Sequence, residues 1–206
     1  MPSSTSFVVI SAVDVKEWIQ DVPSVDRLRP ERCPCCGGAS RPVGEALKIW
    51  GHGLRERLFV GLLSFNFAPE AITIEVRRFL CRRPDCGRTF TVLPRQACTR
   101  RQYLLPTIVL ALALWTLDED SPSPAQIRKR LSSDTLLDHH RPWTSWPQLF
   151  RWAVVDDLSV DVSIEGLNRR RRAEQIARSY AGRSPPSTRH RSLVERAFVG
   201  ANSHLR

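Results

Sequence analysis

The stretch Cys33-Pro34-Cys35-Cys36-Gly37 is answered further along the chain by Cys81-Arg82-Arg83-Pro84-Asp85-Cys86-Gly87-Arg88. Each half contains two cysteines a few residues apart, with a glycine directly after the second one. Glycine accepts a positive φ at that point, so the backbone can turn its amides toward sulfur. Two such halves supply the four thiolates that a structural zinc ion binds as a tetrahedron. We therefore predict one Zn2+ site with the ligands Cys33, Cys36, Cys81 and Cys86.

The sequence leaves several alternatives to this ligand set open. A single C-x-x-C pair also suits redox chemistry, and the thiols could form disulfides or be buried without a ligand. The second pair is C-x4-C, and the gap from residue 37 to 80 is long for a zinc ribbon. Cys35 or His52 could replace a ligand, although the sequence Gly51-His52-Gly53 favours a turn. We place Cys35 and Cys98 outside the site.

The chain of 206 residues is strongly basic, with a formal charge of +10 that comes mostly from Arg. Arg binds phosphate through two hydrogen bonds and stacks on bases, so an acidic polymer is the natural partner. A solvated basic surface without a specific partner is the alternative. The N-terminus lacks the features of a signal peptide, so we expect metal-bound thiols in a reducing cytoplasm. The apolar run from residue 103 to 117 is shorter than the ~20 residues that span a bilayer, which predicts a buried helix and no membrane partner.

Alternating residues indicate strands around the second cysteine pair. Ile72, Ile74 and Val76 alternate with polar residues before Cys81, and residues 89 to 93 alternate again. A β unit this small has little core, so metal binding would supply much of its folding free energy, on the order of 10 kcal/mol. We predict an α+β chain in four parts. They are an N-terminal strand and helix (1 to 28), a small antiparallel β zinc ribbon (29 to 98), a helical, helix-turn-helix-like module (99 to 160) and a basic helical tail (161 to 206).

Two helices with clear start signals follow the apolar run. In the first, Ser123 is the N-cap, Pro124 is the first helical residue and Gln126 completes a capping box. Its apolar stripe is Ile127 and Leu131.

The next helix is predicted to begin at Ser145, with apolar residues at i, i+3, i+4, i+7 and i+8. In a helix-turn-helix the last helix reads base edges, which would let Gln148 contact adenine and Arg151 contact guanine or phosphate. The link between these two helices is longer than the motif's usual turn, so an ordinary helical bundle is the alternative.

The predicted nucleic-acid contacts are basic side chains together with one glutamine. One or two of the arginines near the cysteines are expected to neutralise the thiolates instead. The arginine run of the tail is expected to bind phosphates or to remain solvated. The residues are Arg77, Arg78, Arg82, Arg83 and Arg88 at the second cysteine pair, Arg128, Lys129, Arg130, Gln148 and Arg151 in the helical module, and Arg169, Arg170, Arg171 and Arg172 in the tail.

At both cysteine pairs the sequence resembles the N-terminal zinc ribbon of insertion-sequence transposases. The matching pieces are C-P-x-C-G at Cys33, R-R-F-x-C ending at Cys81, and C-x-R-x-F starting at Cys86. The sequence is also similar to short bacterial proteins of unassigned function that join such a ribbon to a helix-turn-helix. In the transposases these modules bind the ends of the element, so the resemblance implies duplex DNA as the partner and the nucleoid as the location.

Transposases of that type continue into an RNase H-like domain with three metal-binding carboxylates, and this chain ends about where that domain would begin. We interpret the acids at 118 to 120 and 156 to 161 as solvated, and expect neither catalysis nor a small-molecule substrate. The sequence thus predicts a non-enzymatic, zinc-stabilised DNA-binding protein, a regulator or remnant related to mobile elements. RNA is an alternative partner. The other hypotheses are a protein-interaction module that docks on a recombinase or polymerase subunit, and a magnesium-dependent nuclease or transposase fragment.

Overall fold

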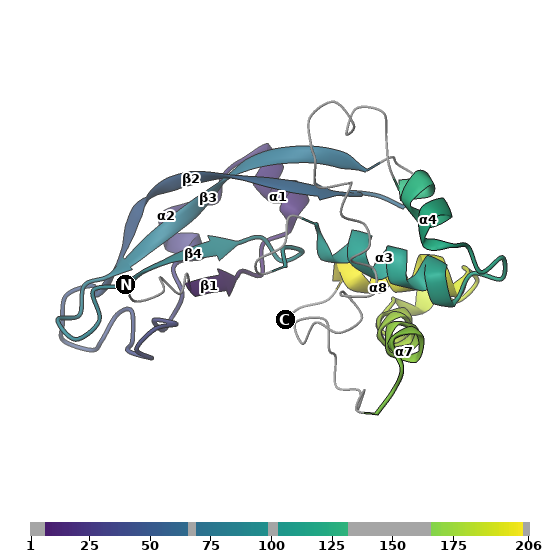
Figure 1. The fold of residues 1–206 in the computed structure, drawn as a ribbon. Helices are drawn as coiled ribbons and strands as arrows, with labels where there is room; N and C mark the ends of the chain where they lie inside the picture. The colour runs from purple at the N-terminus through teal and green to yellow at the C-terminus, as the bar shows by residue number, and fades with distance from the viewer. Residues whose placement is uncertain (1–6, 66–68, 99–102, 132–165, 204–206) are drawn as a thin grey trace, which may run out of the picture. The chain divides into compact units, whose positions relative to one another are not determined.

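The computed structural model describes residues 7–65, 69–98, 103–131 and 166–203 of the chain (Figure 1). They divide into two compact units. Unit 1 contains the described residues up to Leu58 together with Thr73–Ala97, and unit 2 contains those within Phe59–Ile72 and Cys98–Leu205. The protein is α+β, and its described residues form a four-stranded mixed sheet and six α-helices. The helix expected from Ser145, with Gln148 and Arg151, lies outside the described residues.

The sheet has the strand order β1-β4-β3-β2 (Figure 1). The antiparallel ribbon was expected within residues 29 to 98. β1, from the N-terminal segment, joins the same sheet and pairs with β4 in parallel, in a register that runs from Phe7 opposite Phe90 to Ile10 opposite Leu93. The chain between these two strands is long enough for the crossover that a parallel pair requires. β3 pairs with β4 antiparallel. The strands are β1 (Phe7–Ile10), β2 (Ile49–Gly61), β3 (Glu70–Cys81) and β4 (Thr89–Leu93).

The alternation in β3 is confirmed and then shifts by one residue. Ile74 and Val76 are buried between exposed neighbours, as a half-buried strand requires. The next buried positions are Phe79 and Cys81, which are out of step with the first two. Strict alternation from Val76 would have pointed Cys81 to the other face. The shift therefore directs a predicted metal ligand inward.

Two short helices, α1 (Val15–Gln20) and α2 (Val25–Leu28), complete unit 1. The α1 side chain Trp18 is 1% exposed, and its indole Nε1 donates to the Glu75 carbonyl in β3 at 2.7 Å. Apolar burial and this hydrogen bond together attach α1 to the sheet.

The start of α1 is tied to the segment that follows β4. Asp14 is the N-cap, and its carboxylate accepts from the Lys16 amide at 2.9 Å and from Arg95 and Gln96 at 2.5 Å each. Burial raises the pKa of Asp14, but these hydrogen bonds and the Arg95 charge outweigh it and hold the pKa below its usual value. The buried Gln96 also accepts from the Val15 amide at 2.9 Å.

Unit 2 is built around α3 (Leu105–Thr116), which is buried on nearly every side. This agrees with the buried helix predicted from the apolar run. Along the part of the chain that is described, no helix combines the length and apolar character needed to cross a membrane.

The capping box predicted for α4 (Pro124–Leu131) is present. The Ser123 amide donates to Gln126 Oε1 at 2.7 Å, and the Gln126 amide donates to Ser123 Oγ at 3.4 Å. Ile127 and Leu131 are buried, as their spacing indicates.

The C-terminal segment, expected to be a basic tail, supplies two core helices of unit 2. α7 (Arg169–Gly182) and α8 (Leu193–Ser203) pack on α3 and on each other, and the short 3-10 turn η3 (Pro186–Thr188) lies between them. In α7 the apolar side chains Ala173, Ile176, Ala177 and Tyr180 form a stripe at helical spacing, and all are buried. The arginines lie on other faces of a helix that is otherwise amphipathic.

The two C-terminal helices approach each other backbone to backbone. A Cβ atom added at Gly200 of α8 would lie 1.8 Å from the Tyr180 carbonyl oxygen of α7. Only glycine fits at this crossing.

Candidate metal centre

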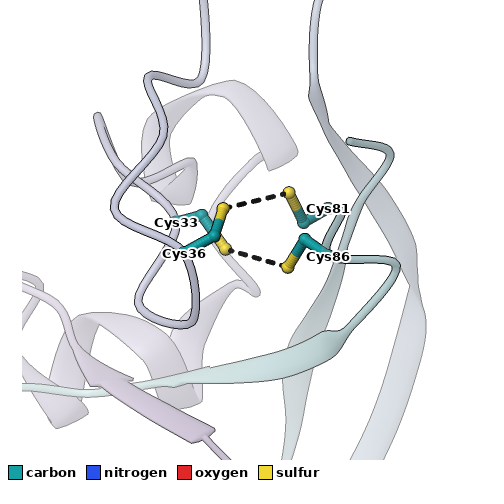
Figure 2. Close-up of side chains that lie close together, drawn as sticks. All are labelled: Cys33, Cys36, Cys81 and Cys86. Atoms are coloured by element: carbon teal, nitrogen blue, oxygen red, sulfur yellow. Dashed lines mark hydrogen bonds between the residues drawn. The ribbon is translucent and has the colours of Figure 1, made fainter. Parts of the chain in front are cut away.

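Four cysteine sulfurs from two distant stretches of unit 1 meet in one cluster (Figure 2). Cys33 and Cys36 lie on one loop, Cys81 ends β3, and Cys86 lies in the turn before β4. All four sulfurs lie within 4.8 Å of one another, and the Cys33–Cys86 and Cys36–Cys81 separations are both 3.9 Å. A tetrahedron with metal–sulfur bonds of about 2.3 Å has edges of about 3.8 Å. The predicted cluster is therefore confirmed, and its size fits a four-coordinate ion.

Both cysteine pairs use the same type of turn. In the first, the Gly37 amide donates to the Cys33 carbonyl at 2.8 Å, and the Cys33 amide donates to the Gly38 carbonyl at 2.9 Å. In the second, the Gly87 amide donates to the Arg83 carbonyl at 3.1 Å. Gly37 has φ 71° and Gly87 has φ 57°, with nothing within 4 Å of an added Cβ atom. The backbone angle, not a lack of space, requires glycine at both positions.

The pKa values of Cys33, Cys81 and Cys86 are shifted from their usual value. Burial raises the pKa of Cys33, but hydrogen bonds from the Cys36 and Cys35 amides and from nearby thiols bring it down to about 7. Burial and the neighbouring thiols raise the pKa of Cys81 to about 12, against the hydrogen bond from the Arg83 amide. Burial is also the largest cause of the raised pKa of Cys86. A bound divalent cation would lower the pKa values of the thiols that it contacts. They would then bind it as thiolates and release their protons.

The alternative ligands lie outside the cluster. Cys35 contributes its amide, which donates to Cys33 Sγ at 3.4 Å, and its own sulfur is not one of the four. Cys98 is buried in the core of unit 2. The prediction of a turn at His52 is wrong, because residues 51 to 53 belong to strand β2. Gly53 has a φ of 88° within that strand. None of the six cysteines forms a disulfide.

Arg83, predicted as a nucleic-acid contact, links the two cysteine pairs. Its Nη2 donates to the Ala39 carbonyl at 3.1 Å, and a Cβ atom at Gly38 would lie 2.2 Å from its Nε. The backbone of Arg83 belongs to the turn of the second cysteine pair, and its guanidinium group fills the space next to the turn of the first pair. The Gly-Gly sequence at 37 and 38 was the only signal for this contact, because a second glycine leaves room for a large neighbour.

The other arginines around the cysteines fall into two kinds. Arg77 donates to the Pro23 carbonyl, and Arg78 donates to Thr89 Oγ1 at 3.4 Å, so both hold elements of unit 1 together. Arg82 lies over the Trp50 ring at 4.5 Å and Arg88 over the Phe7 ring at 5.6 Å. The last two are exposed and keep donors directed to solvent.

The basic residues of unit 2 divide in the same way. Arg130 pairs with Asp118 at 2.8 Å, and Arg170 donates to the Trp115 carbonyl and to Ser121 Oγ, both at 3.3 Å. Arg172 donates through Nε to the Leu167 carbonyl at 3.1 Å. The remaining predicted contacts in the described part of unit 2 are all exposed: Arg128, Lys129, Arg169 and Arg171.

No family model, curated protein or solved structure matches this chain. The four sulfurs and the exposed guanidinium groups are the chemical features from which a function can be inferred.

Proposed function

We propose that this protein is a non-enzymatic, zinc-stabilised DNA-binding protein. The observation that carries the proposal is a set of exposed guanidinium groups that have no hydrogen-bond or ion-pair partner among the described residues. Within the described residues, the side chains of Arg128 in α4 and of Arg169 and Arg171 in α7 form no hydrogen bond or ion pair. A duplex presents closely spaced phosphates that such groups neutralise with release of counterions.

The placement of the α7 arginines makes an anionic partner more favourable. Asn168 caps the helix by accepting from the Arg171 amide at 3.0 Å, and the first turn contains no acidic residue. The positive end of the helix dipole disfavours each cation there by about 0.3–1 kcal/mol. Phosphate groups of a bound duplex would offset that cost.

Zinc is the ion that suits the cysteine cluster best. Four sulfur ligands at tetrahedral separations favour Zn2+ or iron and disfavour the hard cations Mg2+ and Ca2+. In this proposal the ion holds Arg82 and Arg88 in place, because both flank cysteine ligands in the second turn.

The resemblance to transposase ribbons supports the ends of a mobile element as the type of DNA target. The capped helix α4 is compatible with the second helix of a helix-turn-helix. In the proposed third helix, Gln148 and Arg151 would contact the bases. A role as a regulator or a remnant related to mobile elements follows from the same resemblance.

A salt titration of duplex binding tests the proposal. Affinity should fall steeply as salt rises from about 50 to about 300 mM, and Arg171→Gln should reduce the slope of log K against log salt by about 0.9. The matched control is Arg178→Gln on the same helix, since Arg178 already pairs with Glu174 at 2.9 Å. A salt-independent affinity, or no duplex binding, would refute DNA binding.

A protein-interaction role is a second candidate, because apolar side chains are exposed in unit 1. Val43 is fully exposed in the loop before β2, and Trp50 and Leu54 are 45% and 42% exposed in β2. Side chains of this kind anchor protein interfaces. Stoichiometric capture of a recombinase or polymerase subunit that survives nuclease treatment and is lost in Val43→Ser would favour this function.

A further inference from the structure

A cavity of about 590 Å³ opens in unit 2 where the C-terminal end of α3 meets the start of α8. Five apolar side chains line it, and Leu193 is 38% exposed there. Phe65, Leu114 and Leu117 pack against the core of unit 2 with part of their surface uncovered. Cavities of roughly 300–1,000 Å³ hold ligands or the anchoring side chains of peptides. We call this cavity the α3–α8 groove, and its apolar lining is Phe65, Leu114, Leu117, Leu193 and Val194.

Three consecutive acids, Asp118, Glu119 and Asp120, form one side of the α3–α8 groove. The turn that carries them is held in place. The Ser121 amide donates to the Asp118 carbonyl at 3.0 Å, and the Asp120 amide donates to Asp118 Oδ1 at 3.3 Å. The backbone carbonyls at the end of α3 add negative partial charge on the same side.

The nearby cations leave this side negative. Arg130 forms ion pairs with Asp118 at 2.8 Å and with Asp120 at 3.8 Å, and Arg170 donates to Ser121 Oγ of the same turn at 3.3 Å. Two cations therefore accompany the three carboxylates. Arg191, which precedes the groove residue Ser192, is itself paired with Glu195 at 2.5 Å. Within the described part of the chain, Glu119 has no ion pair. An acidic surface next to exposed leucine is unusual on a chain of charge +10.

We infer that the α3–α8 groove binds a basic amphipathic peptide segment of a partner protein. Leucine-type side chains of the segment would enter the apolar cavity, and its Lys or Arg side chains would meet Glu119 and Asp120, as in recognition of a helix by a groove. Nucleic acid and anionic membrane surfaces are repelled by the same carboxylates. This interaction goes beyond the proposed DNA binding, since the peptide partner is positively charged whereas DNA is negatively charged.

Fluorescence anisotropy on the full zinc-loaded chain tests the inference with three labelled peptides of equal length. The first has Leu at i, i+3, i+4 and i+7 with Lys elsewhere. The second replaces Leu by Ser, and the third replaces Lys by Glu. The first peptide should bind at least about 10-fold more tightly than the other two, because only it satisfies both the cavity and the carboxylates.

Matched variants locate the binding site. Glu119→Lys and Leu193→Ser should each weaken binding of the first peptide about 10-fold. Their controls, Glu56→Lys and Ile19→Ser, change an acidic and an apolar residue at exposed positions in unit 1 and should change affinity less than about 2-fold. Circular dichroism and zinc content confirm that each variant is folded.

Four results would overturn the inference. The first is equal binding of the Ser peptide, which would mean that charge alone drives association. The second is tighter binding of the Glu peptide. The third is failure of the first peptide to bind at about 100 µM, which corresponds to a binding free energy of only about −5.5 kcal/mol. The fourth is an equal loss of affinity in the groove variants and their controls.

Discussion

The two units of this protein are stabilised by different means. In unit 2 the central helix α3 is buried on nearly every side, and α7 and α8 contribute apolar stripes to one continuous core. Unit 1 rests on a thin sheet, two short helices and four cysteines that meet in one cluster. Burial of apolar surface stabilises the first kind of unit, whereas we propose that the second kind also needs an ion bound by its cysteines. In this proposal one chain combines a metal-dependent fold with a metal-independent one.

The largest expected effect is that of Cys81→Ser. Removal of one ligand should abolish zinc binding, which contributes on the order of 10 kcal/mol, and should therefore unfold unit 1. Metal analysis and calorimetry should show no zinc and only the thermal transition of unit 2. Cys98→Ser is the control and should keep zinc, because Cys98 lies in the core of unit 2. If the two variants lose zinc equally, the ligand assignment is wrong.

Gly200→Ala should act on unit 2 alone. The new methyl group would overlap the Tyr180 carbonyl oxygen, and overpacking of this kind costs about 3 kcal/mol. The thermal transition of unit 2 should fall while the zinc content stays unchanged.

The control for that change is Gly182→Ala at the end of α7, where an added Cβ atom meets nothing within 4 Å. It should be neutral or stabilise unit 2 by up to about 1 kcal/mol. Equal destabilisation by both alanines would show that helix propensity, not the α7–α8 contact, explains the effect.

Asp14→Ala should weaken unit 1 by about 1–2 kcal/mol at neutral pH, because the helix cap and the contacts to Arg95 and Gln96 are lost. The pKa of Asp14 is lowered in the folded state, so its contribution is present above the unfolded pKa near 3.9 and disappears as pH falls through the lower folded value. The stability difference between wild type and variant, measured by urea unfolding at each pH, should therefore shrink in acid. A difference that grows below pH 4 would contradict this account.

The smallest expected effects are the losses of unit 1 stability on substitution of two neighbouring arginines, Arg82 and Arg83. Arg83→Gln should cost about 1 kcal/mol through the lost hydrogen bond to Ala39. Arg82→Gln should cost only about 0.5 kcal/mol, because its contact with Trp50 is exposed. Urea unfolding of the zinc-loaded protein measures both. A larger loss for Arg82→Gln would show that Arg83 does not link the cysteine pairs.

The cysteine cluster could be predicted from the sequence. The spacing of the cysteines and the glycine after each pair both reflect the backbone conformation of a short local turn. The alternation of β3, the buried helix α3 and the Ser123 capping box were predictable for the same reason. Their signals lie within a few residues of one another.

What the sequence did not reveal depends on contacts between distant segments. The parallel pairing of β1 with β4 joins strands about as far apart as unit 1 allows, and no local pattern specifies it. The stripe from Ala173 to Tyr180 was visible at helical spacing, but the arginine run before it led to the prediction of a tail. Arg83 was grouped with phosphate contacts because its partner, Ala39, lies in the other cysteine pair.

The interleaving of the two units also sets the order in which they can be completed as the ribosome delivers the chain. β4 ends at Leu93, so unit 1 has all its strands and all four thiols before α7 and α8 are synthesised. Val60 and Leu62 belong to the core of unit 2, and their hydrogen-bond partners Leu104 and Thr107 are synthesised later, at the start of α3. Until α7 and α8 are made, unit 1 can be complete while apolar side chains of unit 2 remain exposed to solvent. Exposed apolar surface of this kind makes a folding intermediate prone to aggregation and a target for chaperones.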